Sequence, residues 1–253
     1  MKKPPPRVRV PVLRLEEGEH ALGPDVARYL GSVRRLVQGD AFVAFDPERG
    51  LEADGEVVAL SPGDLVARLG VLRAAKLVAT RDVTWVQGLP KGEKMDGIIR
   101  DATELGVTRI IPVTTEFTVV RLEGPRRLVR QARWERIAHE AARQCGRSDA
   151  PTVDAVVPLS AGLELAVGAR FCLYEHATVP LAKALRSALQ SGGPVSFVAG
   201  PEGGLAPEEV TEAVDAGFDV VSLGDFVLRA ETVAAATLGA LRVMEGFGEH
   251  SSA

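Results

Sequence analysis

Cysteine and aromatic residues are scarce in this sequence, which has two cysteines, two tryptophans and two tyrosines among 253 residues. Cys145 and Cys172 cannot build a disulfide framework and lack the spacing of metal ligands, so we expect a reduced compartment and no metal site. The most apolar window, residues 232–241, is too short to span a bilayer, and the start of the chain lacks the apolar segment of a signal peptide. The sequence therefore predicts a cytoplasmic protein without a membrane partner.

Several nucleotide-binding and hydrolase motifs are also absent. The sequence has no Gly-x-x-x-x-Gly-Lys-Ser/Thr loop, no Gly-x-Gly-x-x-Gly turn after an early strand and no Gly-x-Ser-x-Gly elbow. Its four histidines are scattered, and its net charge of −4 gives no overall positive charge for binding nucleic acid. These absences argue against nucleoside triphosphatases, dinucleotide-dependent enzymes and serine hydrolases.

The charge is nevertheless unevenly distributed. Residues 121–147 hold eight arginines against three acidic residues, whereas residues 196–253 hold two arginines against ten. Residues 1–35 are also basic. This asymmetry indicates either a surface for a polyanion or ordinary solvated helix faces, and the charge count does not decide between them.

The sequence pattern divides the chain into two domains. Short strand-like segments with Pro, Gly and Asp turns between them predict a small β-barrel over residues 1–72, interrupted by one helix with Val26, Leu30, Val33 and Val37 on one face. From residue 73 to 253 strands alternate with helices, which predicts an α/β domain with about five mostly parallel strands. The expected strands are residues 83–87, 109–113, 171–175, 195–199 and 220–223.

Three segments with residues suited to ligand binding or catalysis follow expected strands. Residues 200–204 read Gly-Pro-Glu-Gly-Gly, residues 223–232 contain Arg229 in an acidic stretch, and residues 173–176 end in Glu-His. Because ligands bind outside the carboxyl ends of parallel strands, we expect these loops to form one pocket. The alternatives are a tight turn at 200–204, an ion pair of Arg229 with Glu231 or Glu202, and a structural role for His176.

These segments carry a resemblance to a known family. Residues 200–204 and 223–232, in this order and at this separation, are similar to the two C-terminal motifs of the bacterial 16S rRNA (uracil-N3)-methyltransferase family, known as RsmE, of the SPOUT superfamily. The likeness covers nearly the whole chain, and three positions, Asp101, Tyr29 and Arg34, depart from the Lys, His and Leu common in the family. Further similar segments are residues 7–11, 33–40, 91–95, 104–107 and 140–147.

The resemblance implies a fold, a cofactor and partners. It implies a C-terminal α/β domain whose parallel sheet carries a SPOUT-type trefoil knot, preceded by a PUA-like β-barrel that binds RNA. It implies S-adenosylmethionine bound in the knot, a homodimer, and methylation of N3 of one uridine in 16S rRNA of the 30S subunit, without a metal ion.

The resemblance and the chemistry of uracil together nominate site residues. Arg229 is expected to stabilise the negative charge that spreads onto the uracil carbonyls when N3 loses its proton, and Glu231 to orient Arg229 or accept that proton. Thr232 is also expected to cap the following helix. The expected cofactor-binding residues are Leu173, Tyr174, Glu175, Ala199, Gly200, Pro201, Glu202, Gly203, Leu223, Gly224, Val227, Leu228 and Thr232. The expected RNA-binding residues are Arg7, Arg9, Arg35, Lys91, Arg143 and Arg147.

Other functions stay open at this point. The chain could be a SPOUT methyltransferase acting on another RNA, such as tRNA or large-subunit rRNA. It could be an RNA-binding protein without activity, in which case it would not bind S-adenosylmethionine. It could also use residues 200–204 as an anion site for a phosphate-bearing ligand.

Overall fold

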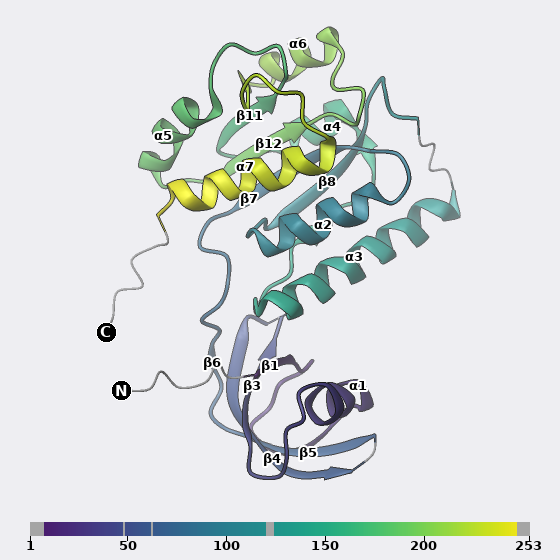
Figure 1. The fold of residues 1–253 in the computed structure, drawn as a ribbon, viewed down its shortest axis with the longest axis vertical. Helices are drawn as coiled ribbons and strands as arrows, with labels where there is room; N and C mark the ends of the chain where they lie inside the picture. The colour runs from purple at the N-terminus through teal and green to yellow at the C-terminus, as the bar shows by residue number, and fades with distance from the viewer. Residues whose placement is uncertain (1–7, 48, 62, 120–123, 247–253) are drawn as a thin grey trace. The chain divides into compact units, whose positions relative to one another are not determined.

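The computed structural model of the chain describes residues 8–47, 49–61, 63–119 and 124–246, which fold into two compact units (Figure 1). The first unit extends to Val78 and also includes Ala142–Ala150, and the second contains Ala79–Ala141 and the chain from Pro151 onward. The first unit thus ends slightly beyond the expected boundary at residue 72. Its second segment, Ala142–Ala150, is not foreseeable from the sequence pattern because it begins within the last turn of a helix, Pro125–Cys145, whose earlier residues belong to the other unit.

The first unit is built around a six-stranded sheet. Its order is β1-β3-β4-β5-β2, with β6 paired to β4, and all pairs are antiparallel except β1 with β3. Strand β2 is an addition to the expected strands. Alternate residues such as Phe42 and Ala44, and Leu65 and Ala67, point into one apolar core because side chains alternate along a strand. The strands are β1 (Val8–Pro11), β2 (Gly18–Leu22), β3 (Ala41–Asp46), β4 (Leu51–Ser61), β5 (Asp64–Leu69) and β6 (Arg73–Ala74).

The expected helix in this unit differs from its prediction. It consists of a short α1 (Pro24–Ala27) followed by a π-helix, η1 (Arg28–Val33). The wider π turn, in which the Arg34 amide donates to the Tyr29 carbonyl at 2.9 Å, breaks the 3.6-residue period on which the prediction rested. Leu30 is buried as expected, but Val33 and Val37 are 63% and 62% exposed, so their assignment to the inner face is wrong.

The second unit contains a wholly parallel seven-stranded sheet. The order is β10-β8-β7-β12-β11-β13, with β9 paired to β8. The five expected strands are present, and β9 and β10, of two residues each, were too short to predict. The strands are β7 (Val83–Gly88), β8 (Arg109–Thr114), β9 (Thr152–Val153), β10 (Val157–Pro158), β11 (Ala169–Leu173), β12 (Val195–Ala199) and β13 (Asp219–Val221).

Helices cover both faces of this sheet (Figure 1). Trp85 and Phe197 point to the face covered by α2, α3, α5 and α7, whereas Val86 and Val198 point to the face covered by α4 and α6. None of the helices in the described part of the chain is long and apolar enough to cross a membrane. The helices are α2 (Lys94–Glu104), α3 (Pro125–Cys145), α4 (Leu159–Glu164), α5 (Leu181–Ser191), α6 (Pro207–Asp215) and α7 (Ala230–Met244).

Candidate active site

A pocket lies at the carboxyl ends of β11, β12 and β13. These strands are neighbours in the sheet, so the loops that follow them meet at one edge, as expected for parallel strands. The hollow measures about 610 Å³ with its open mouth included. Its lining residues are Leu173, Tyr174, Glu175, Ala199, Gly200, Pro201, Glu202, Gly204, Ser222, Leu223, Gly224, Phe226, Val227, Leu228, Ala230 and Val233.

Most of the expected cofactor-binding residues line this pocket, but Gly203 and Thr232 do not. Gly203 lies against Phe117, since a Cβ added to it would stand 2.8 Å from the Cβ of that residue. Thr232 lies inside the first turn of α7, whose N-cap residue is Arg229, so the prediction that Thr232 caps this helix is wrong. Sequence reasoning missed the lining residues Gly204, Ser222, Phe226, Ala230 and Val233, all of which lie beside nominated ones.

The loop after β12 is shaped by close backbone contacts. A Cβ on Gly200 would lie 2.4 Å from the carbonyl carbon of Gly204, so only glycine allows the loop to close on itself. At the end of β7, a Cβ on Gly88 would lie 2.6 Å from Cδ of Pro201. Both glycines therefore bring backbone atoms together where larger residues would push the loop outward and reshape the pocket.

Gln87 holds this loop from inside the sheet. Its buried side-chain amide donates to the Gly200 carbonyl at 3.0 Å and to the Gly88 carbonyl at 2.9 Å. Its Oε1 accepts a hydrogen bond from Trp85 Nε1 at 2.8 Å, which fixes the orientation of the amide. Sequence reasoning missed Gln87, although a polar residue ending an otherwise apolar strand is a usable signal of a buried hydrogen-bond partner.

Glu202 fastens the same loop to the segment after β7. Its carboxylate accepts hydrogen bonds from Lys94 Nζ at 2.8 Å and from the Lys91 amide at 3.1 Å. Burial acts to raise the pKa of the Glu202 carboxyl, but these bonds outweigh it, so that pKa lies below its usual value. Glu202 is thus occupied by Lys94, which removes it as the partner of Arg229.

Arg229 stands at the rim of the pocket. Its neighbours Leu228 and Ala230 line the pocket, while its own side chain is exposed and forms no hydrogen bond or ion pair with a residue that the structure describes. The ion pairs with Glu202 or Glu231 that were the structural alternative do not form. A guanidinium without a carboxylate partner keeps its charge available to a ligand at this rim.

Glu231, the second residue of α7, has a carboxylate oxygen without a partner among the described residues. Its Oε2 is buried and accepts no hydrogen bond from any described residue. Glu231 lies in the first turn of α7, where the amino end of the helix favours negative charge. A buried acceptor that the protein leaves unsatisfied is rare in folded chains and marks a position suited to a ligand proton.

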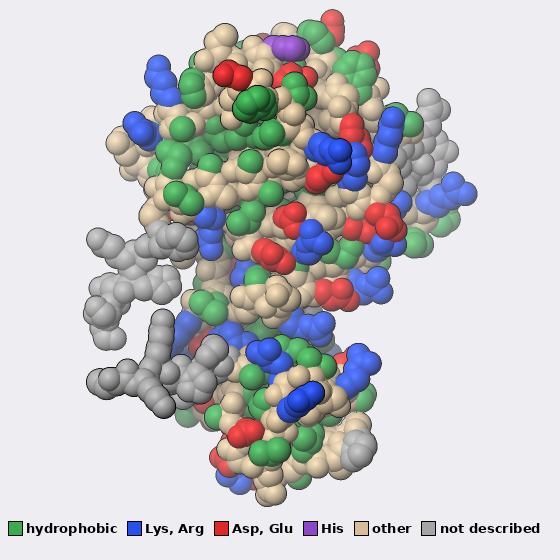
Figure 2. Space-filling model, viewed as in Figure 1, with side chains coloured by type: hydrophobic (Ala, Val, Ile, Leu, Met, Phe, Trp, Pro, Cys, Tyr) green, Lys and Arg blue, Asp and Glu red, His purple; other side chains and the backbone are tan. Residues whose placement is uncertain are grey.

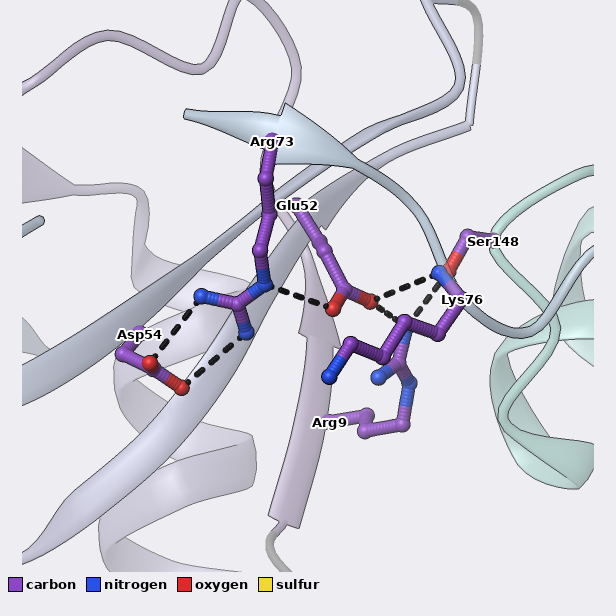
Figure 3. A network of polar contacts seen from close by, with 6 residues as sticks. All are labelled: Arg9, Glu52, Asp54, Arg73, Lys76 and Ser148. Atoms are coloured by element: carbon purple, nitrogen blue, oxygen red, sulfur yellow. Dashed lines mark hydrogen bonds and ion pairs between the residues drawn. The ribbon is translucent and has the colours of Figure 1, made fainter. Parts of the chain in front are cut away.

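The expected RNA-binding residues fall into two groups, and the first consists of arginines that already have partners within the protein. Arg9 donates to Glu52 Oε2 at 2.8 Å and to Ser148 Oγ, and its side chain is 15% exposed (Figure 3). Arg147 is buried and donates to Asp149 Oδ2 at 2.6 Å. Both guanidiniums are paired with carboxylates of the first unit, and their contact with RNA phosphates stays a prediction.

The second group remains accessible. Arg35 and Lys91 are exposed and Arg143 is half-buried, and the side chains of all three lack an ion-pair partner among the described residues. Arg7 lies outside the residues that the structure describes. Within the described ranges, no group of three or more His, Cys, Asp or Glu side chains is arranged to hold a metal ion.

Comparison with known proteins links both units to enzymes that modify RNA. Residues 78–242 match the family model described as an RNA methyltransferase domain, and residues 22–70 match the one described as an RNA methyltransferase PUA domain. The Mycobacterium bovis protein named ribosomal RNA small subunit methyltransferase E is 34% identical over 242 residues, covering 93% of this chain and 87% of that protein. The Bacillus subtilis protein of the same name is 29% identical, covering 84% of this chain and 85% of that protein.

Solved structures show the same similarity. The ribosomal RNA small subunit methyltransferase E of Neisseria gonorrhoeae, bound to S-adenosylmethionine, superposes with a TM-score of 0.81 at 26% identity, covering 94% of this chain and 98% of that one. A Legionella pneumophila protein described as a putative methyltransferase, with bound S-adenosylmethionine, also gives 0.81, at 25% identity, covering 94% of this chain and 98% of that one.

Proposed function

Because this chain belongs to the RNA methyltransferase family of the ribosomal RNA small subunit methyltransferases E, we propose that it methylates N3 of one uridine in 16S rRNA with S-adenosylmethionine as the methyl donor. The observation that carries the proposal is the pocket at the edge of the parallel sheet, beside which Arg229 forms no ion pair with a described residue. Two structural neighbours that superpose over 94% of the chain are described as bound to the same donor.

The residues around the pocket fit this donor. The pocket is concave and combines backbone groups of glycine-containing loops with apolar side chains, as is common in small-molecule sites. Backbone groups of Gly200, Leu223 and Leu228 would hold the polar parts of the donor, and side chains such as Leu173 and Val233 would bury its apolar surface. When bound, S-adenosylmethionine supplies a methyl group attached to a positively charged sulfur.

Arg229 has the charge that methylation at N3 requires. Uracil N3 carries a proton and is a weak nucleophile until that proton leaves, after which negative charge spreads onto the two ring carbonyls. The Arg229 guanidinium, which has no competing carboxylate partner among the described residues, would stabilise that charge at the pocket rim. Alignment of the reacting atoms would supply a further ~7–11 kcal/mol.

Glu231 is the proposed acceptor of the N3 proton or the group that orients Arg229. Its buried and unpartnered Oε2 provides an acceptor near the rim that no described protein donor occupies. Burial and the missing partner support this role over a purely structural one, because a structural carboxylate in a folded protein normally has its hydrogen bonds filled.

The proposal includes a homodimer with a trefoil knot in each C-terminal domain, as the resemblance implies. The knot would involve residues 200–204 and 222–229, whose loops meet at the pocket. Phe226, Val227 and Val243 are 87%, 82% and 68% exposed, and Figure 2 shows hydrophobic side chains gathered over α5 and α7. Such an apolar surface favours a second copy of the chain, and sedimentation equilibrium is expected to give twice the chain mass of 26.8 kDa.

The RNA would be held by the accessible basic residues. We propose that Arg35, Lys91 and Arg143 contact phosphates of 16S rRNA in the 30S subunit, and that the protein acts in ribosome biogenesis in the cytoplasm. Binding through phosphates should weaken as salt is added, because counterions compete for the same charge. An affinity for rRNA that does not change with salt would contradict these contacts.

A methyl-transfer assay tests the proposal. The protein is incubated with tritiated S-adenosylmethionine and with 30S subunits, naked 16S rRNA, tRNA or large-subunit rRNA, and the modified nucleoside is identified by mass spectrometry. We expect N3-methyluridine as the product. Label in another nucleoside, or label only in tRNA or large-subunit rRNA, would point to a different methyltransferase. The absence of both donor binding and transfer would point to an RNA-binding protein without activity.

Arg229→Ala provides the matched test of the mechanism. This variant should bind S-adenosylmethionine within a few-fold of the wild type in calorimetry, because Arg229 does not line the pocket. Its turnover should fall by about 10²–10³, the usual cost of removing a donor that stabilises developing negative charge. Turnover close to that of the wild type would show that Arg229 is not the catalytic group.

A further inference from the structure

Tyr29 brings two arginines together in the first unit. The Arg34 guanidinium carbon lies 5.9 Å from the centre of the Tyr29 ring, and that of Arg143 lies 6.0 Å from the same centre. Tyr29 is half-buried on η1 and packs against the core of the unit, so its ring is a fixed platform. Because both guanidinium carbons lie within about 6 Å of one point, they are at most about 12 Å apart.

This pair of charges is not neutralised by the described protein. Neither Arg34 nor Arg143 forms an ion pair with a described carboxylate, although six other arginines of the same unit do so: Arg9, Arg28, Arg49, Arg68, Arg73 and Arg147. A cation–π contact holds a guanidinium in place without cancelling its charge. Two guanidinium charges within about 12 Å of each other attract an anionic chain, and guanidinium groups bind phosphates through charge-assisted hydrogen bonds.

We propose that Tyr29, Arg34 and Arg143 form a clamp for backbone phosphates of the RNA substrate. This inference rests on the proposed function for the identity of its ligand, and adds Tyr29 and Arg34 to the binding surface. Figure 2 shows Lys and Arg side chains on the face of the first unit around α1, which fits an extended polyanion better than a single small anion. Guanidinium planes also stack on unpaired bases, so a single strand gains contacts that a duplex does not offer.

The Tyr29 ring, rather than its hydroxyl, carries this role. The hydroxyl makes no hydrogen bond to any residue within the described ranges, whereas the ring is the group shared by both arginines. Tyr29→Phe keeps the ring, and Tyr29→Leu removes it while both charges remain. This pair of variants therefore separates the organisation of the charges from the charges themselves.

The test is fluorescence anisotropy of a labelled single-stranded RNA oligonucleotide, with a duplex of the same length as a second probe. The full chain is used without S-adenosylmethionine, and the melting temperature of each variant confirms that it is folded. Arg34→Ala and Arg143→Ala should each weaken binding by about five- to tenfold and reduce the slope of log affinity against log salt by ~0.7. The double variant should reduce the slope by ~1.4.

Arg68→Ala is the matched control. It removes the same charge from an exposed residue of the same unit, but this arginine already pairs with Glu19 and Glu56. We expect its affinity within about twofold of the wild type, because a paired surface arginine has little charge left for RNA. Tyr29→Phe should also bind like the wild type, whereas Tyr29→Leu should bind at least threefold more weakly with nearly the wild-type salt slope.

The results separate this inference from the proposed function. If Arg34→Ala and Arg143→Ala behave like Arg68→Ala, or if Tyr29→Leu binds like the wild type, the clamp is disproved even if methyl transfer is intact. If the clamp variants weaken RNA binding while no methyl transfer is found, the clamp stands and the proposed function fails. Equal losses on the duplex would support a clamp for phosphates alone, and larger losses on the single strand would support added stacking on bases.

Discussion

In the first unit both oxygens of the buried Glu52 carboxylate accept hydrogen bonds, whereas in the second unit the buried Oε2 of Glu231 accepts none from a described residue. Glu52 accepts hydrogen bonds from Arg9 on β1, from Arg73 on β6 and from the backbone amide of Lys76, which lies shortly after β6 (Figure 3). The difference separates two uses of a carboxylate. Glu52 has its hydrogen bonds filled and joins parts of the first unit together, whereas Glu231 keeps an acceptor without a described donor on the helix that begins beside the pocket.

The pKa of Glu52 reflects this saturation. Burial acts to raise the pKa of the Glu52 carboxyl, but hydrogen bonds from Arg9, Lys76 and Arg73 together lower it below its ordinary value of 4.5. Glu52 therefore stays charged and bound at neutral pH. We infer that the first unit uses its arginines mainly to hold itself together, and that the arginines left without carboxylates are those available to RNA.

The largest expected effect comes from removing the satisfied carboxylate. Glu52→Ala leaves Arg9 and Arg73 without their buried partner and should lower the free energy of unfolding by ~3–5 kcal/mol in urea denaturation. Glu56→Ala is the control, because Glu56 lies on the same strand but is exposed, and its ion pair with Arg68 is long at 4.0 Å. The loss of unfolding free energy in this control should stay below ~1 kcal/mol. Equal losses of unfolding free energy in the two variants would contradict the structural role of Glu52.

The open carboxylate should respond in the opposite way. Glu231→Gln removes a charge that has no described partner, so its unfolding free energy should stay within ~0.5 kcal/mol of the wild type or increase. Methyl transfer should fall by about 10²–10⁴, the usual contribution of a positioned proton acceptor. A variant that loses stability but keeps turnover would make Glu231 a structural residue and contradict its proposed role.

The loop at the pocket should be sensitive to a single methyl group. Gly200→Ala places its Cβ 2.4 Å from the Gly204 carbonyl carbon, and displacement of the loop should weaken S-adenosylmethionine binding by about 10- to 100-fold, equivalent to ~1–3 kcal/mol of overpacking. Gly193→Ala is the matched control, since a Cβ there would meet nothing within 4 Å. Donor affinity measured by calorimetry should not change in this control. Similar affinities of both variants would show that the loop does not shape the donor site.

The smallest expected effect is the change in the stability contribution of Glu52 at acidic pH. Because the pKa of Glu52 is lowered by folding, its contribution to stability is complete above its ordinary value of 4.5 and is lost as the pH falls through the folded value. The stability difference between the wild type and Glu52→Gln should therefore be constant at neutral pH and shrink only below about pH 4.5. Urea unfolding of both proteins across this range measures it. A difference that is unchanged in strong acid would contradict the assignment.

The comparison also shows what the sequence could reveal. Residues 200–204 and 223–232 were identifiable because they form compact motifs at the ends of strands, and strand ends are readable from short apolar runs. The contacts Glu52–Arg9 and Gln87–Gly200 were not identifiable, because the partners lie far apart in the sequence: Arg9 is 43 positions from Glu52, and Gly200 is 113 positions from Gln87. The carboxylate partners of Arg9 and Arg147 were not identifiable either, since no local pattern shows whether a guanidinium is already paired.

Local geometry accounts for the remaining differences. Val33 and Val37 were assigned to a buried face on the assumption of an α-helical period, which the π turn of η1 does not keep. Strands β9 and β10 are held by neighbours in the sheet rather than by their own two-residue sequences. These misreadings fall outside the three loops that form the pocket, so the prediction of a pocket at this edge did not depend on them.

A crystal structure of the protein with S-adenosylmethionine would test the central claim most directly. We predict that the donor lies in the hollow between the loops after β11, β12 and β13, in contact with the backbone of Gly200, Leu223 and Leu228 and with its methyl group toward Arg229. A donor bound elsewhere on the chain, or a hollow that stays empty at saturating donor, would contradict the account.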